Sequence, residues 1–145
     1  MRFMMLMIPR GYQKAQPSAL PDAQAIAAML AYNESLQKAG VLLALDGLHP
    51  PSSGTRVTFS AGKPIVTPGP FPEASETLGG YWMIEVKSKQ EAIEWATRCP
   101  PSDDAVIEVR QVQEISDFPD DVMPAQVAAR EKALSEELKT KRVRS

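Results

Sequence analysis

The sequence predicts one small α+β domain in which strands and helices alternate along the chain. Three observations lead to this prediction. The chain has 145 residues, the usual size of a single domain. Hydrophobic residues make up 43% of it, enough for one core and too few for a membrane protein. Its 13 prolines are spread along the chain and separate segments with the lengths of ordinary strands and helices.

The first predicted elements are a strand and a helix. Residues 2–8 (RFMMLMI) are an apolar run that is too short for a helix before Pro9, which predicts a strand buried on both faces. Pro21 suits the first turn of a helix, and Gly40 suits its end. Between them apolar residues recur at helical spacing, so we expect a helix at about 21–39.

A second strand and a hairpin follow. Residues 41–45 (VLLAL) form another apolar strand, which runs into an irregular segment. Residues 55–60 (TRVTFS) alternate between polar and apolar, as in a half-exposed strand. Residues 65–67 are the expected returning arm of a hairpin, which Pro68 ends.

The next segments repeat the strand and helix order. Residues 81–86 (YWMIEV) are predicted to form a strand that is apolar on both faces. Ser88 and Glu91 have the spacing of a capping box, so a second helix should begin there and end at Pro100-Pro101. Residues 105–115 alternate and predict a last strand with one solvated face.

The C-terminal part is predicted to be a third helix from Pro124 with a basic end. Its apolar positions are Val127, Leu134 and Leu138. We therefore expect residues 1–115 to form the main domain and residues 116–145 a helical extension.

The order of elements is β-α-β-β-α-β with a hairpin inserted and a helix appended, which is the ferredoxin-like plan. That plan places the strands at 2–8 and 81–86 in the middle of the sheet and the other two main strands at its edges. The apolar run at 41–45 does not suit an edge. Two helices cover only one face of such a sheet, so we expect a second copy of the chain to cover the other face in a homodimer.

Composition argues against several classes of function. The 16 Lys and Arg against 18 Asp and Glu give a net charge of −2, which argues against nucleic-acid binding. No apolar run approaches the roughly 18 residues of a membrane span. A lone cysteine, Cys99, favours a reducing compartment, so we expect a cytoplasmic protein. One histidine and one cysteine supply no metal-ligand set, and no glycine-rich nucleotide loop is present, so we expect no metal and no cofactor.

A family resemblance comes from an ordered set of short motifs. They are Ala39-Gly40-Val41, Gly47-Leu48-His49-Pro50, Thr67 to Glu76 with its Gly69-Pro70-Phe71, Gly79-Gly80-Tyr81 and Glu94-Trp95-Ala96. From about Arg2 to Val112 the chain resembles the YCII-related proteins, in particular the branch named for an Asp-Gly-Pro-Phe motif. The resemblance implies a bacterial protein with a dimeric ferredoxin-like α/β barrel and no agreed reaction. In that family a His/Asp pair in a cleft suggests an enzyme, and genes for alternative sigma factors beside some members suggest a regulatory setting.

The chain departs from the motif at two positions. Pro68 stands where the family has Asp, and Ser75 stands where it often has Lys. The matching residues are Gly69, Pro70, Phe71, Glu73 and Glu76. Loss of the Asp removes the usual acid partner of a histidine.

His49 is the central candidate for function, because it is the chain's one histidine and follows a strand in a loop. An imidazole can give or take a proton near neutral pH. Asp46 is the nearest acid along the chain and could meet His49 only if Gly47 bends the chain. The predicted ligand-binding residues are Asp46, His49, Gly69, Phe71, Glu73 and Trp82.

Two functions remain open from the sequence. The first is small-molecule binding in a cleft near His49 and the 67–71 turn, with a regulatory role. The alternative is a cofactor-free enzyme in which His49 acts as general acid or base on a small, partly apolar substrate. Each candidate residue also has a structural interpretation: His49 could cap a turn, and Phe71 could anchor a rigid, proline-set turn.

Overall fold

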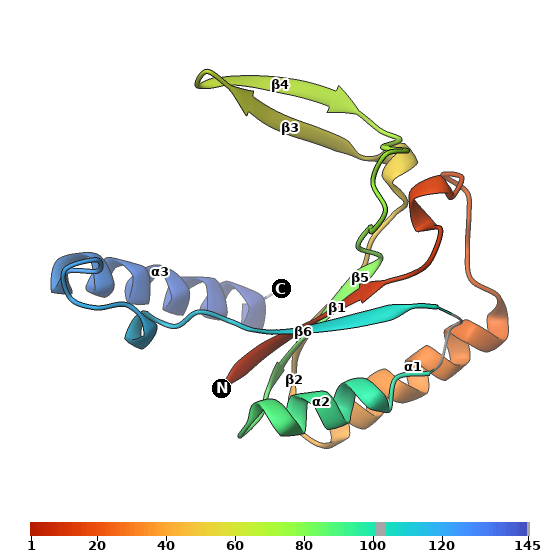
Figure 1. Cartoon of the computed structure of the whole chain (residues 1–145). Coiled ribbons are helices and arrows are strands. Elements are labelled where there is room, and N and C mark those ends of the chain that lie inside the picture. Colours follow the sequence, from red (N-terminus) through yellow and green to blue (C-terminus); the bar gives the residue numbers. More distant parts are fainter. Residues whose placement is uncertain (101–103, 145) are drawn as a thin grey trace. The chain divides into compact units, whose positions relative to one another are not determined.

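Nine helices and strands form the framework of the computed structural model (Figure 1), which describes residues 1–100 and 104–144. In chain order they are β1 (Arg2–Ile8), α1 (Ala23–Lys38), β2 (Leu42–Gly47), β3 (Thr55–Ser60), β4 (Lys63–Pro68), β5 (Gly80–Glu85), α2 (Lys89–Thr97), β6 (Val106–Gln111) and α3 (Ala125–Arg144). Three short 3-10 helices join them: η1 (Tyr12–Lys14), η2 (Pro51–Ser53) and η3 (Ile115–Asp117). The chain divides into unit 1, Met1–Val112, and unit 2, Gln113–Ser145, and each is described by itself.

The main sheet of unit 1 has four strands in the order β2-β5-β1-β6, with every neighbouring pair antiparallel. Met5 in β1 lies opposite Trp82 of β5 on one side and Val109 of β6 on the other. The prediction that the strands at 2–8 and 81–86 lie in the middle is therefore confirmed. The sheet, the hairpin and the helices also confirm an α+β architecture.

The core lies between this sheet and the two helices α1 and α2, which cover the same face (Figure 1). Its largest fully buried side chains include Phe3, Met5, Leu36 and Ile84. The adjacent strand residues, which point to the opposite face, are only half-buried. On the face turned away from the helices the two central strands are thus half-buried in the single chain, and this is the face that a second copy is expected to cover.

Local hydrogen bonds explain where the helices begin. Asp22 is the N-cap of α1, because its carboxylate accepts the N–H of Ala25 at 2.7 Å. The hydroxyl of Ser88 accepts the N–H of Glu91 at 3.1 Å, as predicted. The Glu91 carboxylate, however, accepts the N–H of Lys87 at 2.9 Å, one residue before the expected partner. Pro101, expected with Pro100 to end α2, lies outside the described residues.

The last strand is shorter than predicted. β6 ends at Gln111, although the N–H of Val112 still donates to the carbonyl of Arg2 at 2.9 Å. Ile115 begins η3 instead of ending the strand, and the N–H of Glu114 donates to the Asp117 carboxylate at 2.7 Å. This local capping takes the backbone out of the sheet, and alternation alone did not reveal it.

The apolar edge strand β2 is explained by an irregularity in its pairing. The register with β5 shifts between Leu42 and Ala44, as in a β-bulge. Leu42 and Leu45 both pack against the core, while Leu43 at the shift is 45% exposed. A run that looked fully buried thus belongs to an edge strand with one side chain directed to solvent.

The hairpin β3–β4 forms a separate two-stranded sheet. The strand predicted at residues 55–60 is confirmed as β3, but all twelve residues of β3 and β4 are exposed in the single chain, not half of them. In unit 2, α3 carries no buried residue, and Val127, Leu134 and Leu138 are each about half exposed. Within the described residues, no helix is both long and apolar enough to cross a membrane.

Candidate functional site

The segment that carries His49 is held by hydrogen bonds on its N-terminal side. The N–H of Leu48 donates to the carbonyl of Gly79 at 2.9 Å, and the N–H of Gly79 donates to that of Met7 at 2.8 Å. The hydroxyl of Tyr12 donates to the carbonyl of Leu48 at 2.5 Å. The residue before His49 is therefore tied both to the sheet and to the loop after β1.

The segment after His49 packs against the 67–71 turn. Pro50 is fully buried. The N–H of Gly69 donates to the carbonyl of Gly54 at 2.8 Å, and a Cβ built on Gly69 would lie 1.8 Å from the carbonyl oxygen of Pro51. Any side chain at position 69 would therefore collide with backbone, so this close approach requires glycine. The Gly69–Pro70 peptide bond is cis.

The rest of the turn is anchored by Phe71, which is 7% exposed. The Arg56 guanidinium lies 4.0 Å from the centroid of the Phe71 ring, and its nitrogen lies 4.0 Å from a carboxylate oxygen of Glu73. Phe71 does not belong to the main core, so these residues form a second, smaller cluster at the base of the hairpin.

His49 itself is exposed. In residues 1–100 and 104–144, no hydrogen bond to its imidazole is found. The carboxylate of Asp46 accepts the hydroxyl proton of Tyr81 at 2.8 Å, from the residue directly opposite on β5. The structure therefore joins Asp46 to Tyr81 on the face away from the helices, and the His49 ring stands without an oriented acid partner in the part of the chain described.

Trp82 occupies a different place from the other predicted site residues. It is 5% exposed and lies in the core under the helices, where its indole N–H donates to the amide oxygen of Asn33 at 2.7 Å. Its ring meets that of Tyr32 edge-on at 5.6 Å. The Tyr32 hydroxyl donates to the carbonyl of Trp95 at 2.7 Å, and burial, with a smaller contribution from Cys99, raises the Tyr32 pKa.

Two residues near the site, Tyr12 and Arg56, were missed from the sequence. Tyr12 reaches Leu48 across 36 residues of chain, and burial raises its pKa. Arg56 stacks on Phe71 from the hairpin. No local pattern marks such residues, because their roles come from contacts between distant segments.

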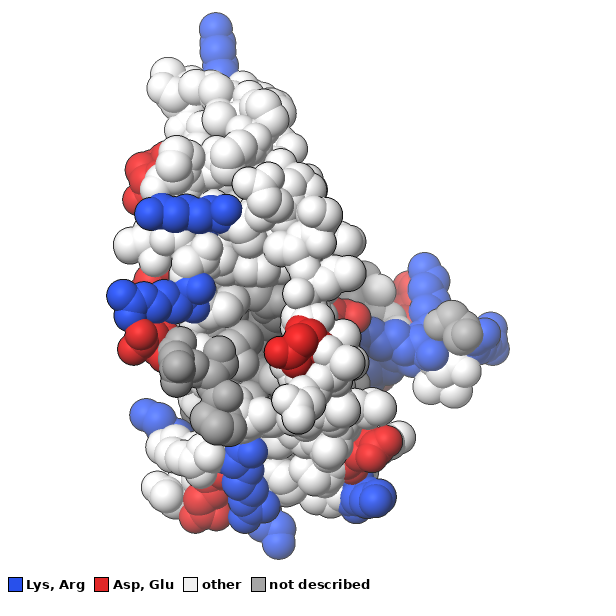
Figure 2. All heavy atoms as spheres, turned by 90° about the vertical axis from the view of Figure 1, so that its right-hand side faces the viewer, with Lys and Arg blue, Asp and Glu red and all other residues white. Residues whose placement is uncertain are grey.

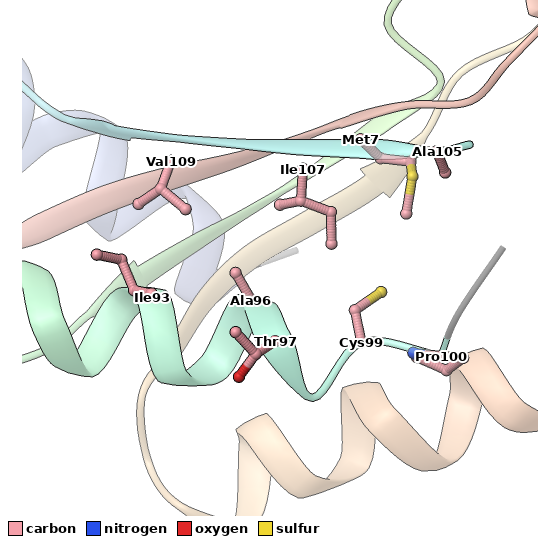
Figure 3. A pocket seen from close by; sticks show the side chains of 9 residues that line it. All are labelled: Met7, Ile93, Ala96, Thr97, Cys99, Pro100, Ala105, Ile107 and Val109. Atoms are coloured by element: carbon pink, nitrogen blue, oxygen red, sulfur yellow. The ribbon is translucent and has the colours of Figure 1, made fainter. Parts of the chain in front are cut away.

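A separate groove lies between α2 and the strands β1 and β6 (Figure 3). Its volume is about 620 Å³, and its lining is mostly apolar: Met7, Ile93, Ala96, Thr97, Cys99, Pro100, Ala105, Ile107 and Val109. Cys99 directs its side chain toward the strand side of the groove, and burial raises its pKa to about 11. The thiol is therefore protonated at neutral pH, which suits a structural role better than a reactive one.

The charged residues visible in Figure 2 do not gather into a patch of one sign. On the face shown in Figure 2 uncharged residues prevail, and Lys and Arg are interspersed with Asp and Glu. No group of three or more His, Cys, Asp or Glu side chains in the described ranges could hold a metal ion.

Comparison with known proteins supports the sequence resemblance. The chain is 32% identical over 75 residues to an uncharacterised protein of Rhizobium meliloti (strain 1021). The alignment covers 52% of this chain and spans only 60% of the length of that relative. A profile of the YCII-related domain matches residues 1–116, which include the whole sheet, the hairpin, His49 and the 67–71 turn. With most of its length matched, the chain belongs to the YCII-related family.

Proposed function

We propose that unit 1 is a small-molecule binding module of the Asp-Gly-Pro-Phe branch, which holds its ligand beside His49 and the 67–71 turn and has a regulatory role. One observation carries this proposal. The exposed imidazole of the chain's one histidine stands between a hydrogen-bonded residue, Leu48, and a fully buried one, Pro50. Because the backbone on both sides of His49 is held, a ligand that binds the imidazole has to order only that side chain, which limits the loss of conformational entropy.

The groups around His49 favour a small and partly apolar ligand. Asp46 and Tyr81 offer a carboxylate and a phenol at the same end of β2 and β5. Leu48 is 44% exposed and offers apolar surface. Binding sites for small molecules commonly combine apolar walls with a few polar groups that fix orientation. The expected ligand therefore carries a polar head that an imidazole can bond and a short apolar part.

Binding without catalysis is favoured over an acid/base reaction by the surroundings of His49. A catalytic imidazole is normally oriented by a second group, often a carboxylate. The resemblance implies an Asp for that purpose at the position of Pro68, and proline has no side chain that can accept a hydrogen bond. Asp46 is already bonded to Tyr81.

The proposed module is a homodimer. The helices α1 and α2 cover one face of the sheet, and on the other face Met4, Leu6 and Met83 are apolar and half-buried. A second copy could cover this face and form the dimeric α/β barrel that the resemblance implies. The domain boundary expected at residue 115 and the role of unit 2 stay predictions beside this proposal.

The test is incubation of the protein with a mixture of small metabolites, followed by native mass spectrometry and by analysis of the mixture. We expect one compound to bind unchanged and His49→Ala to weaken its binding at least about tenfold, the value of one lost charged or polar contact. Lys87→Ala is the matched control, since Lys87 is also exposed but lies beside α2.

The outcomes separate the alternatives. Conversion of a compound that stops in His49→Ala would replace the binding proposal by the enzyme alternative. Binding that His49→Ala leaves intact would place the ligand elsewhere in the chain and overturn the proposed site.

A further inference from the structure

The hairpin β3–β4 has two chemically different faces. Residues directly opposite each other in an antiparallel pair point to the same face, and the pairs Val57↔Val66 and Phe59↔Pro64 therefore share one face. Pro68, opposite Thr55, ends the same face at its base. The hairpin apolar face consists of Val57, Phe59, Pro64, Val66 and Pro68 with Thr55. The opposite face is largely polar and consists of Arg56, Thr58, Ser60, Lys63, Ile65 and Thr67.

The hairpin apolar face is unusually exposed for its composition. Val57 is 52% exposed, Phe59 74% and Val66 66%. A two-stranded hairpin is at best marginally stable alone in water and normally needs a surface to pack on. No charged residue interrupts this face, although lysine and other charges are the usual protection of exposed strands.

The opposite face is used within the same chain. Arg56, at its base, stacks on the Phe71 ring at 4.0 Å and approaches the Glu73 carboxylate at 4.0 Å. Phe71 is in turn buried. These contacts between the hairpin and the 67–71 turn come from its polar face, whereas Val57, Phe59 and Val66 on the apolar face are each more than half exposed.

We infer that the hairpin apolar face docks on a second copy of this chain, as an arm of the homodimer proposed above, on which this inference rests. The area that a stable dimer needs supports this occupant. A face of four strands with about six residues each has a flat area of roughly 400 Å², from the spacing of strands and residues, and its accessible area is larger because side chains protrude from it. A partner in a standard interface contributes about 800 Å².

The hairpin apolar face, with two strands of six residues each, adds roughly half as much flat area again to the open sheet face of the same unit. A symmetric dimer uses each such surface twice, which doubles the benefit of one arm. The arm also continues into the candidate site, because β4 ends at Pro68 and the 67–71 turn follows directly. The dimer contact therefore reaches the wall of the proposed binding site.

The test compares exposed side chains on the two faces of the hairpin. Sedimentation velocity gives the dimer dissociation constant of the wild type, of Val66→Ser and Phe59→Ser on the apolar face, and of Ile65→Ser on the other face. Ile65 is 49% exposed, so its substitution is a matched control. We expect each apolar-face variant to weaken the dimer about ten- to hundredfold, the value of one buried apolar side chain. Ile65→Ser should change the constant by less than about threefold.

Two results would overturn the inference. One leaves the proposed homodimer in place, and the other contradicts the homodimer as well. In the first, Val66→Ser and Phe59→Ser dimerise as tightly as Ile65→Ser, while Leu6→Lys on the open sheet face breaks the dimer. The hairpin then does not contact the partner copy, and the proposed dimer stands. If the wild type stays monomeric up to about 100 μM, well above the concentrations at which standard interfaces associate, both fall. Ligand binding at His49, measured in the same samples, reports on the proposed site independently.

Discussion

The main sheet and the hairpin use the same kind of strand pairing but differ completely in burial. In the main sheet Phe3, Met5 and Ile84 are almost inaccessible to solvent, because α1 and α2 pack over them. In the hairpin every residue is exposed, including Phe59 at 74%. Regular strand geometry therefore does not tell whether a strand has a core. The cover must come from elements of the same chain or from another molecule.

The difference has a thermodynamic consequence. The free energy of unfolding of unit 1 should depend on side chains between the sheet and its helices, whereas hairpin side chains should affect association. The phenylalanines Phe3 and Phe59 allow the sharpest comparison, since the same residue type lies in each region.

The largest expected effect is that of Phe3→Ala. Removal of a fully buried ring leaves a cavity and should lower the free energy of unfolding by about 3–5 kcal/mol. Phe59→Ala should change it by less than about 0.5 kcal/mol in the monomer. Urea unfolding, at a protein concentration too low for dimer formation, measures the free energy of unfolding of both variants. Equal losses of unfolding free energy in Phe3→Ala and Phe59→Ala would show that hairpin side chains contribute to stability as core side chains do.

The next effect concerns Gly69, where the hairpin joins the 67–71 turn. Gly69→Ala places a methyl group against the carbonyl of Pro51, so the turn must shift, and we expect a loss of about 1–3 kcal/mol. Gly47→Ala is the control, since a Cβ there meets nothing within 4 Å. Thermal unfolding of both variants measures the difference in their stability. A Gly69→Ala protein as stable as Gly47→Ala would contradict the close packing of the turn.

A smaller effect is expected at the polar contact within the core. Tyr32→Phe removes the hydroxyl that donates to the Trp95 carbonyl and leaves that acceptor without its partner. The expected loss is about 1–2 kcal/mol. Ser35→Ala removes a comparable hydroxyl bond, from Ser35 to the Tyr32 carbonyl one turn away, at a less buried position. Chemical denaturation should rank Tyr32→Phe as the more harmful of the two.

The smallest effect is expected at Arg56, which ties the hairpin to the turn. Arg56→Gln removes the contact with the Phe71 ring and an exposed ion pair with Glu73. Such contacts contribute about 0.5–1 kcal/mol together at exposed sites. The change should appear as faster hydrogen exchange of hairpin amides, with the amides of β1 unaffected. Faster exchange in both regions would show that the hairpin and the core unfold together.

Much of the fold was predictable from the sequence, because the elements differ in period and are separated by glycine and proline. The central positions of the strands at 2–8 and 81–86 followed from the ferredoxin-like order of elements, agreed with their apolar composition and were confirmed. The bulge after Leu42 could not be predicted, since it depends on pairing with β5. The end of β6 was missed because the capping around Asp117 competes with strand pairing.

Less of the candidate site was predictable. The turn around Gly69 was identified from its glycine and prolines. The structure explains the glycine, because a Cβ at position 69 would collide with the carbonyl of Pro51. The partners of Asp46 and Trp82 were not predictable, because Tyr81 and Asn33 lie on other elements. The same holds for Tyr12, whose hydroxyl fixes the carbonyl before His49.

The most direct test of the central claim is a ¹H–¹⁵N NMR titration of the uniformly labelled protein with the compound that the metabolite screen selects. We expect the signals of His49, Leu48, Asp46 and the 67–71 turn to shift together, and their titration curves to fit one dissociation constant. Signals around Cys99 in the separate groove should stay in place. Shifts confined to the residues of that groove, with the His49 signals unchanged, would contradict ligand binding beside His49 and the 67–71 turn.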